Sequence, residues 1–185
     1  MSVFPKPYAD FVARLRVASG FVLVLAFAWF SRPDFRSLAI GLPVSLLGLL
    51  LRAWATGHLE KNIRLAEGGP YAYVRNPLYL GTLLAAAGLV MASRRWLLAI
   101  LFAGVFVLIY LPVIELEEQH LNKLFSNFAG YAKRVPSLWP TLNPVKSDAR
   151  FEWSLYLRNQ EYQALLGFLA GEVFLIAKVL FPRIP

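Results

Sequence analysis

Long apolar stretches alternate with short polar ones along the chain. Each apolar stretch approaches the ~17–25 residues that a helix needs to cross ~30 Å of hydrocarbon. There are five of them, at 12–30, 38–56, 78–93, 96–114 and 162–181. The third is the shortest, and we expect it to form a hairpin with the fourth, turned at Ser93-Arg94-Arg95. The pattern predicts an all-α polytopic membrane protein with about five transmembrane helices.

The polar segments between these stretches differ in character. The fourth helix is expected to continue past the bilayer over 114–131, and VPSLWPTLNP at 135–144 to form an extended strap, because it contains three prolines. FEWSLYLRNQEY at 151–162 mixes aromatic and charged residues, which is typical of a helix in the membrane interface. We therefore describe residues 1–185 as one integral-membrane domain with three parts, 1–56, 57–142 and 143–185.

Composition narrows the class of protein. Hydrophobic residues make up 58% of the 185, charged residues only 16%, and the net charge is +8. Nucleic-acid-binding proteins carry Lys and Arg on a polar surface that this chain lacks, so we expect no nucleic-acid partner. The absence of cysteine excludes disulfides, thiolate metal sites and cysteine nucleophiles. No small-residue cleavage pattern follows the first apolar stretch, which we interpret as a retained anchor.

The basic residues predict the orientation in the membrane, because Lys and Arg collect on the cytosolic side. With a cytosolic N-terminus, twelve basic residues fall on the inner side and five on the outer side. This distribution favours a cytosolic N-terminus. It also predicts that 57–77 and 115–161, which hold nearly all candidate site residues, share the cytosolic face.

The stretch GPYAYVRNPLYLG at 69–81 is the first candidate site. Asn76 and Pro77 are a favoured N-cap and first residue of a helix. Capping does not account for Arg75 and three nearby tyrosines, although tyrosine also anchors helices at membrane interfaces. Amides at a helix start suit an anion, and tyrosine faces suit a cation. The stretch is therefore a candidate binding site for a polar ligand.

The stretch ELEEQHL at 115–121 supplies carboxylates. On a helix Glu115 and Glu118 share a face, which is also typical of a solvated helix end. The predicted hairpin would bring this end back beside Arg75. A glutamate in that position could accept hydrogen bonds from ribose hydroxyls or from an adenine amino group.

Other chemistries lack their motifs. His58 and His120 do not have the paired spacing of metal ligands, so we expect no metal. No serine lies in a nucleophile elbow, and neither GxGxxG nor a P-loop is present. A nucleotide-like cofactor would have to be held in another way.

Glu172, Arg52 and Lys178 are charged-type residues deep enough in the apolar stretches to need an explanation. Glu172 lies about 15 Å along the fifth helix, at ~1.5 Å per residue. A carboxyl at that depth is either functional or protonated and hydrogen-bonded to a neighbouring helix. Arg52 and Lys178 lie nearer to helix ends and are expected to snorkel toward the inner and outer faces.

Together GPYAYVRNPLYLG, ELEEQHL and VPSLWP resemble the isoprenylcysteine carboxyl methyltransferase family and its phospholipid methyltransferase relatives. The family pattern is GxYxxxRHPxYxG, then EExxL, then a Tyr-rich segment ending in VPxxxP, and the match covers about residues 54–142 in that order. Members are embedded in the membrane and use S-adenosylmethionine. The resemblance implies methyl transfer to a hydrophobic or lipidated small molecule or peptide, or to a membrane lipid.

The resemblance also implies a cofactor pocket on the cytosolic side, closed by loops and the interfacial helix. Asn76 stands where the family usually has His, and Asn cannot act as a base near neutral pH. Carried over residue by residue, the pocket consists of His58, Ile63, Arg64, Leu65, Ala66, Tyr71, Asn76, Pro77, Leu78, Tyr79 and Glu117.

Methyl transfer from a sulfonium is an in-line displacement, in which alignment can contribute ~7–11 kcal/mol. An ionised carboxylate acceptor needs no base, and Arg75 or Arg158 could orient it. An amine acceptor must lose a proton, and the candidate bases for that are Glu118, Glu161 and Glu172.

Two other classes of protein remain open. A membrane reductase of the sterol-reductase type would bind NADPH, but the EExxL match and the scarcity of Arg near the site argue against it. A non-catalytic membrane scaffold would use the polar loops only for capping and interfacial anchoring.

Overall fold

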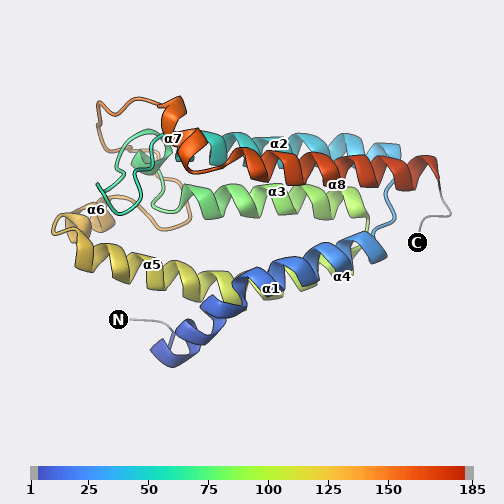
Figure 1. The fold of residues 1–185 in the computed structure, drawn as a ribbon, viewed down its shortest axis with the longest axis horizontal. Helices are drawn as coiled ribbons and strands as arrows, with labels where there is room; N and C mark the ends of the chain where they lie inside the picture. Colours follow the sequence, from blue (N-terminus) through green and yellow to red (C-terminus); the bar gives the residue numbers. More distant parts are fainter. Residues whose placement is uncertain (1–3, 182–185) are drawn as a thin grey trace. The chain divides into compact units, whose positions relative to one another are not determined.

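The computed structural model describes residues 4–181, and these form only helices and loops (Figure 1). Three of the helices long and apolar enough to cross a membrane are α1 (Lys6–Phe30), α2 (Phe35–Thr56) and α8 (Tyr162–Leu180). The fourth is a continuous run of α4 (Trp96–Val105), η2 (Phe106–Tyr110) and α5 (Leu111–Leu124). A shorter apolar helix is α3 (Pro77–Ser93), and the remaining elements are η1 (Gly69–Ala72), α6 (Phe128–Arg134) and α7 (Trp153–Arg158). The predicted polytopic all-α class is confirmed.

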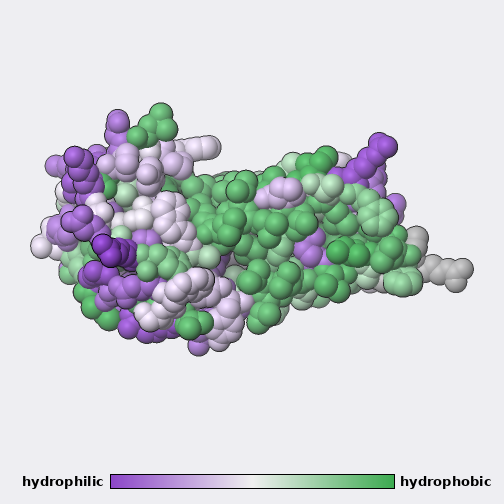
Figure 2. Space-filling model, turned by 90° about the horizontal axis from the view of Figure 1, so that it is seen from above, coloured by the Kyte–Doolittle hydropathy of each residue, from purple (hydrophilic) through white to green (hydrophobic). Residues whose placement is uncertain are grey.

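The chain divides into two compact units. The first contains Met1–Pro43, Ala86–His120 and Ala170–Pro185, and the second contains Val44–Ala85 and Leu121–Leu169. Helices α2, α3, α5 and α8 contribute to both units. Hydrophobic residues cover the long helices, whereas hydrophilic residues gather over the loops of the second unit (Figure 2).

Small residues let α2 and α3 pack with their backbones close together. In the first unit, a Cβ atom on Gly41 would overlap the Gly88 carbonyl and Ala92. In the second unit, a Cβ atom on Gly48 would overlap the backbone of Gly81 and Ala85. Helices in lipid associate largely through such close van der Waals contact, because hydrocarbon solvates apolar side chains as well as protein does.

Serine hydroxyls add hydrogen bonds to this packing. Ser37 donates to the carbonyl of Ala92 over 2.8 Å in the first unit, and Ser45 donates to that of Ala85 over 2.8 Å in the second. Each hydroxyl donates to a helix carbonyl, which can accept a second hydrogen bond, so the hydroxyl has a partner in an apolar setting. The small-residue spacing on the two helices was visible in the sequence but was not part of the prediction.

Asp34 and Ser37 cap the start of α2 reciprocally. The Ser37 amide donates to Asp34 Oδ1 over 2.7 Å, and the Asp34 amide donates to Ser37 Oγ over 2.9 Å. This is the geometry of a capping box. The Ser37 amide, and then the Arg94 guanidinium, hold the pKa of Asp34 below its usual value.

The end of α1 is capped by charged side chains. The last carbonyls of a helix have no partner within it. Lys178 donates to the carbonyl of Ala28 over 2.8 Å and Arg95 to that of Phe30 over 3.2 Å. Lys178 as a whole residue is 9% exposed, and its ammonium lies against this helix end. A cation there also complements the helix dipole.

η2 is a π-helical turn within the run from Trp96 to Leu124. It ends at Tyr110, two residues before Pro112 of α5. Proline has no amide hydrogen, so the carbonyl four residues earlier, that of Leu108, cannot receive its normal helical bond. The Tyr8 hydroxyl donates to that carbonyl over 2.6 Å instead. The Leu111 amide donates to Phe106, five residues back, which is the π-helical pattern.

The fourth helix ends earlier than predicted. α5 stops at Leu124, and a turn at 125–127 precedes α6, whereas we expected one helix to Tyr131. Ser126 and Asn127 favour turns because their side chains compete with helical hydrogen bonds. The turn lets Phe125 pack with Phe128 and Tyr131 in one cluster.

The close approach of α2 and α3 predicts that Gly→Ala destabilises the protein at Gly48 of α2. The control is Gly20 of α1, where the same substitution meets no other atoms. Gly20→Ala adds its methyl in open space, so it should be neutral or stabilise by ~0.5–1 kcal/mol through helix propensity. Gly48→Ala should destabilise by ~1–3 kcal/mol, because its Cβ meets backbone atoms. The measurement is thermal unfolding in detergent, and equal midpoints for both variants would contradict the packing described.

Candidate functional site

The loop after α2 is shaped around a buried histidine. His58 is 5% exposed, and its Nδ1 lies 2.9 Å from the carbonyl of Trp54. Gly69 has φ +57°, and a Cβ there would lie 2.6–2.7 Å from His58 ring atoms. Only glycine meets both conditions at low cost, since it tolerates a positive φ and brings no side chain.

Three predicted cofactor residues from separate positions of the motif region meet in one cluster. Ala66 and Tyr71 pack with Ala55 at the end of α2, and Leu78 lies against this group. Leu65, also predicted, instead packs against the cluster of Phe128, Tyr131 and Val135. The two clusters are linked by the Tyr131 hydroxyl, which donates to the carbonyl of Tyr71 over 2.8 Å.

The Pro-rich strap lies against the GPYAYVRNP stretch and is neither helix nor strand over 135–144. The amides of Arg75 and Asn76 donate to the carbonyls of Pro136 and Ser137 over 2.8 and 3.1 Å. In the reverse direction, the Thr141 amide donates to the carbonyl of Tyr73 over 2.9 Å. The strap thus supplies partners for backbone groups of the segment between η1 and α3.

Side chains of the motif reinforce this contact. Arg75 Nη1 donates to the carbonyls of Ala132 and Val135 over 2.8 and 2.6 Å, at the end of α6. Asn76 Nδ2 donates to Ser137 Oγ over 3.1 Å, and α3 begins at Pro77 as predicted. Both side chains therefore hold the strap, and the catalytic role of Arg75 stays a prediction.

The most exposed predicted residues of the loop lie apart from the buried cluster. Ile63 is 66% exposed. Arg64 forms ion pairs with Glu60 at 2.9 Å and Glu152 at 4.0 Å, which tie the loop to the segment before α7. Tyr79 is half-buried in the first turn of α3.

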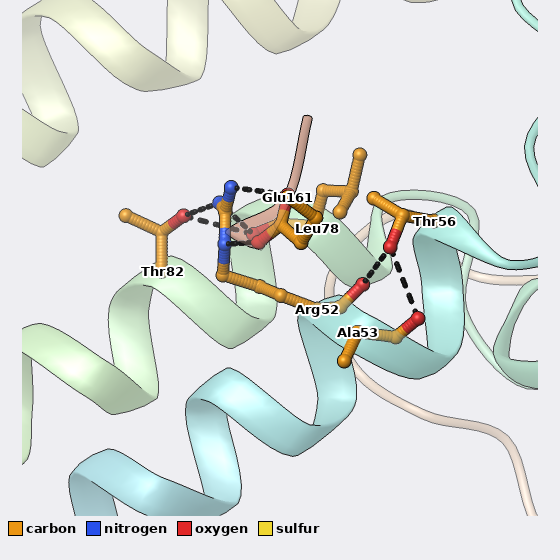
Figure 3. A network of polar contacts seen from close by, with 6 residues as sticks. All are labelled: Arg52, Ala53, Thr56, Leu78, Thr82 and Glu161. Atoms are coloured by element: carbon orange, nitrogen blue, oxygen red, sulfur yellow. Dashed lines mark hydrogen bonds and ion pairs between the residues drawn. The ribbon is translucent and has the colours of Figure 1, made fainter. Parts of the chain in front are cut away.

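Arg52 forms the most buried ion pair of the second unit (Figure 3). Its Nε and Nη2 donate to the two carboxylate oxygens of Glu161 over 2.6 and 3.0 Å. Its Nη1 donates to Thr82 Oγ1 over 2.6 Å and to the carbonyl of Leu78 over 3.3 Å. Arg52 thus has a bidentate partner within reach at the helix ends, which the sequence did not indicate.

The residues before α8 fasten it to the end of α2. Asn159 Nδ2 donates to the carbonyls of Thr56 and Leu59, at and just after the end of α2, over 3.1 and 2.9 Å. Gln160 has φ +55°, so the chain reverses there at a residue that rarely adopts this conformation. The predicted helix 151–162 is observed only as α7, and the reversal at Gln160 accounts for its end at Arg158.

The remaining predicted residues are distributed over both units. Glu117 belongs to the first unit, where it pairs with Arg16 at 3.3 Å, each side chain about half exposed. Glu118 is half-buried in the same helix. Arg158 is exposed in the last turn of α7 and forms no hydrogen bond or ion pair within residues 4–181.

Aromatic rings extend from the motif to α7. Trp54 lies 6.4 Å from both Tyr73 and His58, measured between ring centroids. Phe151 continues the series, 6.1 Å from His58 and 5.0 Å from Trp153. Trp54 and Tyr73 remain 43% and 39% exposed, so their rings are accessible to a ligand or to lipid.

A model of the phospholipid methyltransferase family matches residues 15–127, more than half of the chain. The chain belongs to the phospholipid methyltransferase family. The predicted resemblance to phospholipid and isoprenylcysteine methyltransferases is thereby confirmed, and the family supports a membrane methyltransferase.

Three curated relatives show how far this family similarity extends. The Nickel-cobalt-cadmium resistance protein NccN of Alcaligenes xylosoxydans xylosoxydans is 29% identical over 80% of this chain and 75% of its own length. The Cobalt-zinc-cadmium resistance protein CzcN of Cupriavidus metallidurans is 31% identical over 64% of this chain and 56% of its own. The Protein-S-isoprenylcysteine O-methyltransferase of Schizosaccharomyces pombe is 27% identical over 74% of this chain and 60% of its own. No solved structure matches the chain significantly.

The Arg52–Glu161 pair predicts a large loss of stability when one partner is removed. Glu161→Ala should destabilise the protein by about 3 kcal/mol, because it leaves a guanidinium largely buried without its counter-charge. Glu60→Ala, which breaks the more exposed pair with Arg64, should cost below about 1 kcal/mol. Removing both charges with Arg52→Met and Glu161→Leu should cost less than Glu161→Ala alone.

The free energy of unfolding of these variants can be measured by titration with sodium dodecyl sulfate in mixed micelles. Equal losses for Glu161→Ala and Glu60→Ala would contradict a structural role of the buried pair.

Proposed function

We propose that the protein transfers a methyl group from S-adenosylmethionine to a carboxylate on a hydrophobic or lipidated acceptor. The observation that carries this proposal is the cluster in which Ala66, Tyr71 and Leu78, all implied by the family motifs, pack at the end of α2. These residues lie up to twelve positions apart in the sequence. Their meeting supports a common binding role.

The donor set around this cluster suits S-adenosylmethionine. Adenine offers a flat face for stacking, the ribose needs hydrogen-bond partners, and the sulfonium is a cation that favours aromatic faces by ~0.5–2 kcal/mol. Trp54 and Tyr73 present partly exposed rings, and Asn76 and Tyr79 carry polar groups in or beside the first turn of α3. We therefore propose that the second unit holds the adenosyl part.

When bound, S-adenosylmethionine supplies an electrophilic methyl carbon with a neutral thioether as leaving group. The chain's own contribution is then alignment of the acceptor. Arg158, exposed and without a partner in residues 4–181, could orient an acceptor carboxylate by a bidentate contact. Arg75 contributes by holding the strap through its bonds to Ala132 and Val135.

The need for a base distinguishes a carboxylate acceptor from an amine acceptor, which would have to use Glu118, Glu161 or Glu172. Both oxygens of Glu161 accept hydrogen bonds from Arg52, so this carboxylate is already engaged. Asn76 cannot take up a proton near neutral pH. An ionised carboxylate acceptor attacks without losing a proton, so this set of residues is sufficient for it.

Binding separates this proposal from the other classes. Purified protein in detergent should bind S-adenosylmethionine and its demethylated product at micromolar level in isothermal titration, and NADPH weakly or not at all. Preference for NADPH would indicate a reductase, and no heat from any of the three would indicate a scaffold.

Two neighbouring glutamates test the cofactor residues. Glu117→Ala should weaken binding of the demethylated product by about tenfold or more, because a hydrogen bond to a charged group contributes ~1.5–3 kcal/mol. Glu115→Ala is the matched control on the same helix and should change the affinity little. Equal effects would contradict the assignment of Glu117.

The acceptor can be identified with radiolabelled S-adenosylmethionine and two probes. An S-prenylated cysteine with a free carboxylate should be methylated, and phosphatidylethanolamine, an amine, should not. Arg158→Gln should lower turnover of the carboxylate probe and leave binding of the demethylated cofactor unchanged. The opposite acceptor preference would overturn the carboxylate proposal and leave methyl transfer itself standing.

A further inference from the structure

Two large apolar side chains point away from the protein on the Pro-rich strap. Trp139 is 83% exposed and Leu142 is 96% exposed, although Val135 at the start of the same strap is 1% exposed. Scattered exposed apolar residues are ordinary on a protein surface. A tryptophan and a leucine three positions apart on one short loop form a local apolar tip.

The exposure of this tip is fixed by the backbone. The Asn76 amide binds the Ser137 carbonyl on one side of the tip, and the Thr141 amide binds the Tyr73 carbonyl within it. Prolines at 136, 140 and 144 restrict the backbone further. The protein thus presents the two side chains in a defined position, with little conformational entropy left to lose on binding.

Basic residues flank the tip. Lys133 and Lys146 are exposed and form no hydrogen bond or ion pair within residues 4–181. Arg150 extends this charge, Arg134 is paired with Glu67 at 3.9 Å, and Asp148 is the single acidic residue between 133 and 150. Clusters of Lys and Arg beside a membrane are attracted to anionic lipid within about a Debye length.

The backbone limits how deep the tip can go. The strap is irregular, and backbone groups without partners are not tolerated in the hydrocarbon. In the headgroup layer, water and lipid oxygens can satisfy them, and tryptophan is enriched there because its ring is amphipathic. The headgroup layer therefore suits all three features of the strap: its apolar tip, its basic flanks and its irregular backbone.

We propose that residues 137–143 insert Trp139 and Leu142 into the headgroup layer of anionic lipid, with Lys133 and Lys146 on the lipid phosphates. The partner is the surface of the bilayer that the long helices cross. This contact does not depend on methyl transfer. The lipid would hold the exposed side of the strap, and the hydrogen bonds of Arg75 and Asn76 hold its protein side.

The absence of cysteine makes a site-directed label straightforward. Trp139→Cys, Leu142→Cys and, as control, Asp148→Cys would each carry a nitroxide in the full chain. The protein is reconstituted in vesicles of phosphatidylcholine with phosphatidylglycerol. Collision rates of the nitroxide with oxygen, which enters lipid, and with a water-soluble nickel chelate are then measured by paramagnetic resonance.

Labels at 139 and 142 should collide more with oxygen and less with the nickel chelate than the label at 148. Equal access of the nickel chelate to all three positions would overturn the proposal. So would dipolar broadening at 139 that disappears on dilution with unlabelled protein, because it would identify a second copy as the partner.

The basic flanks have a test of their own. Lys133→Gln combined with Lys146→Gln should make the label at 142 more accessible to the nickel chelate in the anionic vesicles. Vesicles of phosphatidylcholine alone should have the same effect on the chain with both lysines. An unchanged accessibility in both experiments would overturn the assignment of anionic lipid as the partner.

Discussion

Arg52 and Glu161 bring opposite charges together at the ends of apolar helices, and the organisation of the second unit depends on that contact. Arg52 comes from α2, Glu161 directly precedes α8, and the remaining guanidinium donor reaches Leu78 and Thr82 of α3. One side chain therefore sets the positions of three helix ends. Since Leu78 also belongs to the cluster with Ala66 and Tyr71, the ion pair supports the same helix turn that the family motif supplies.

The strap also fixes the start of α3, through hydrogen bonds with the motif residues that precede this helix. Its carbonyls receive the amides of Arg75 and Asn76, and the Arg75 side chain reaches back to the end of α6. The first turn of α3 is thus held by α2 and α8 through Arg52, and by the strap through the motif itself. A polar loop between apolar helices can be rigid in this way, because nearly every backbone group at the turn has a partner.

Helix positions followed directly from the sequence, because a span of lipid requires a long apolar run that polar loops interrupt. The start of α3 at Pro77 and the turn at Arg94, with φ +55°, were predicted by capping and charge. The partners of Arg52 and Lys178 were not, since both bonds join residues more than a hundred positions apart. The family motifs identified Ala66, Tyr71 and Leu78, but periodicity alone gives no reason to join them.

The single wide turn η2 fixes the direction in which the carboxylates of α5 point. Each residue advances a helix by about 100°, so one extra residue in the turn rotates everything after it by that angle. Glu115, Glu117 and Glu118 all follow η2. A homologue that lost one residue at 106–110 would keep the ELEEQHL letters and yet aim its acidic groups at a different neighbour. In comparisons with this protein, the length of that segment is therefore as informative as the identity of the glutamates.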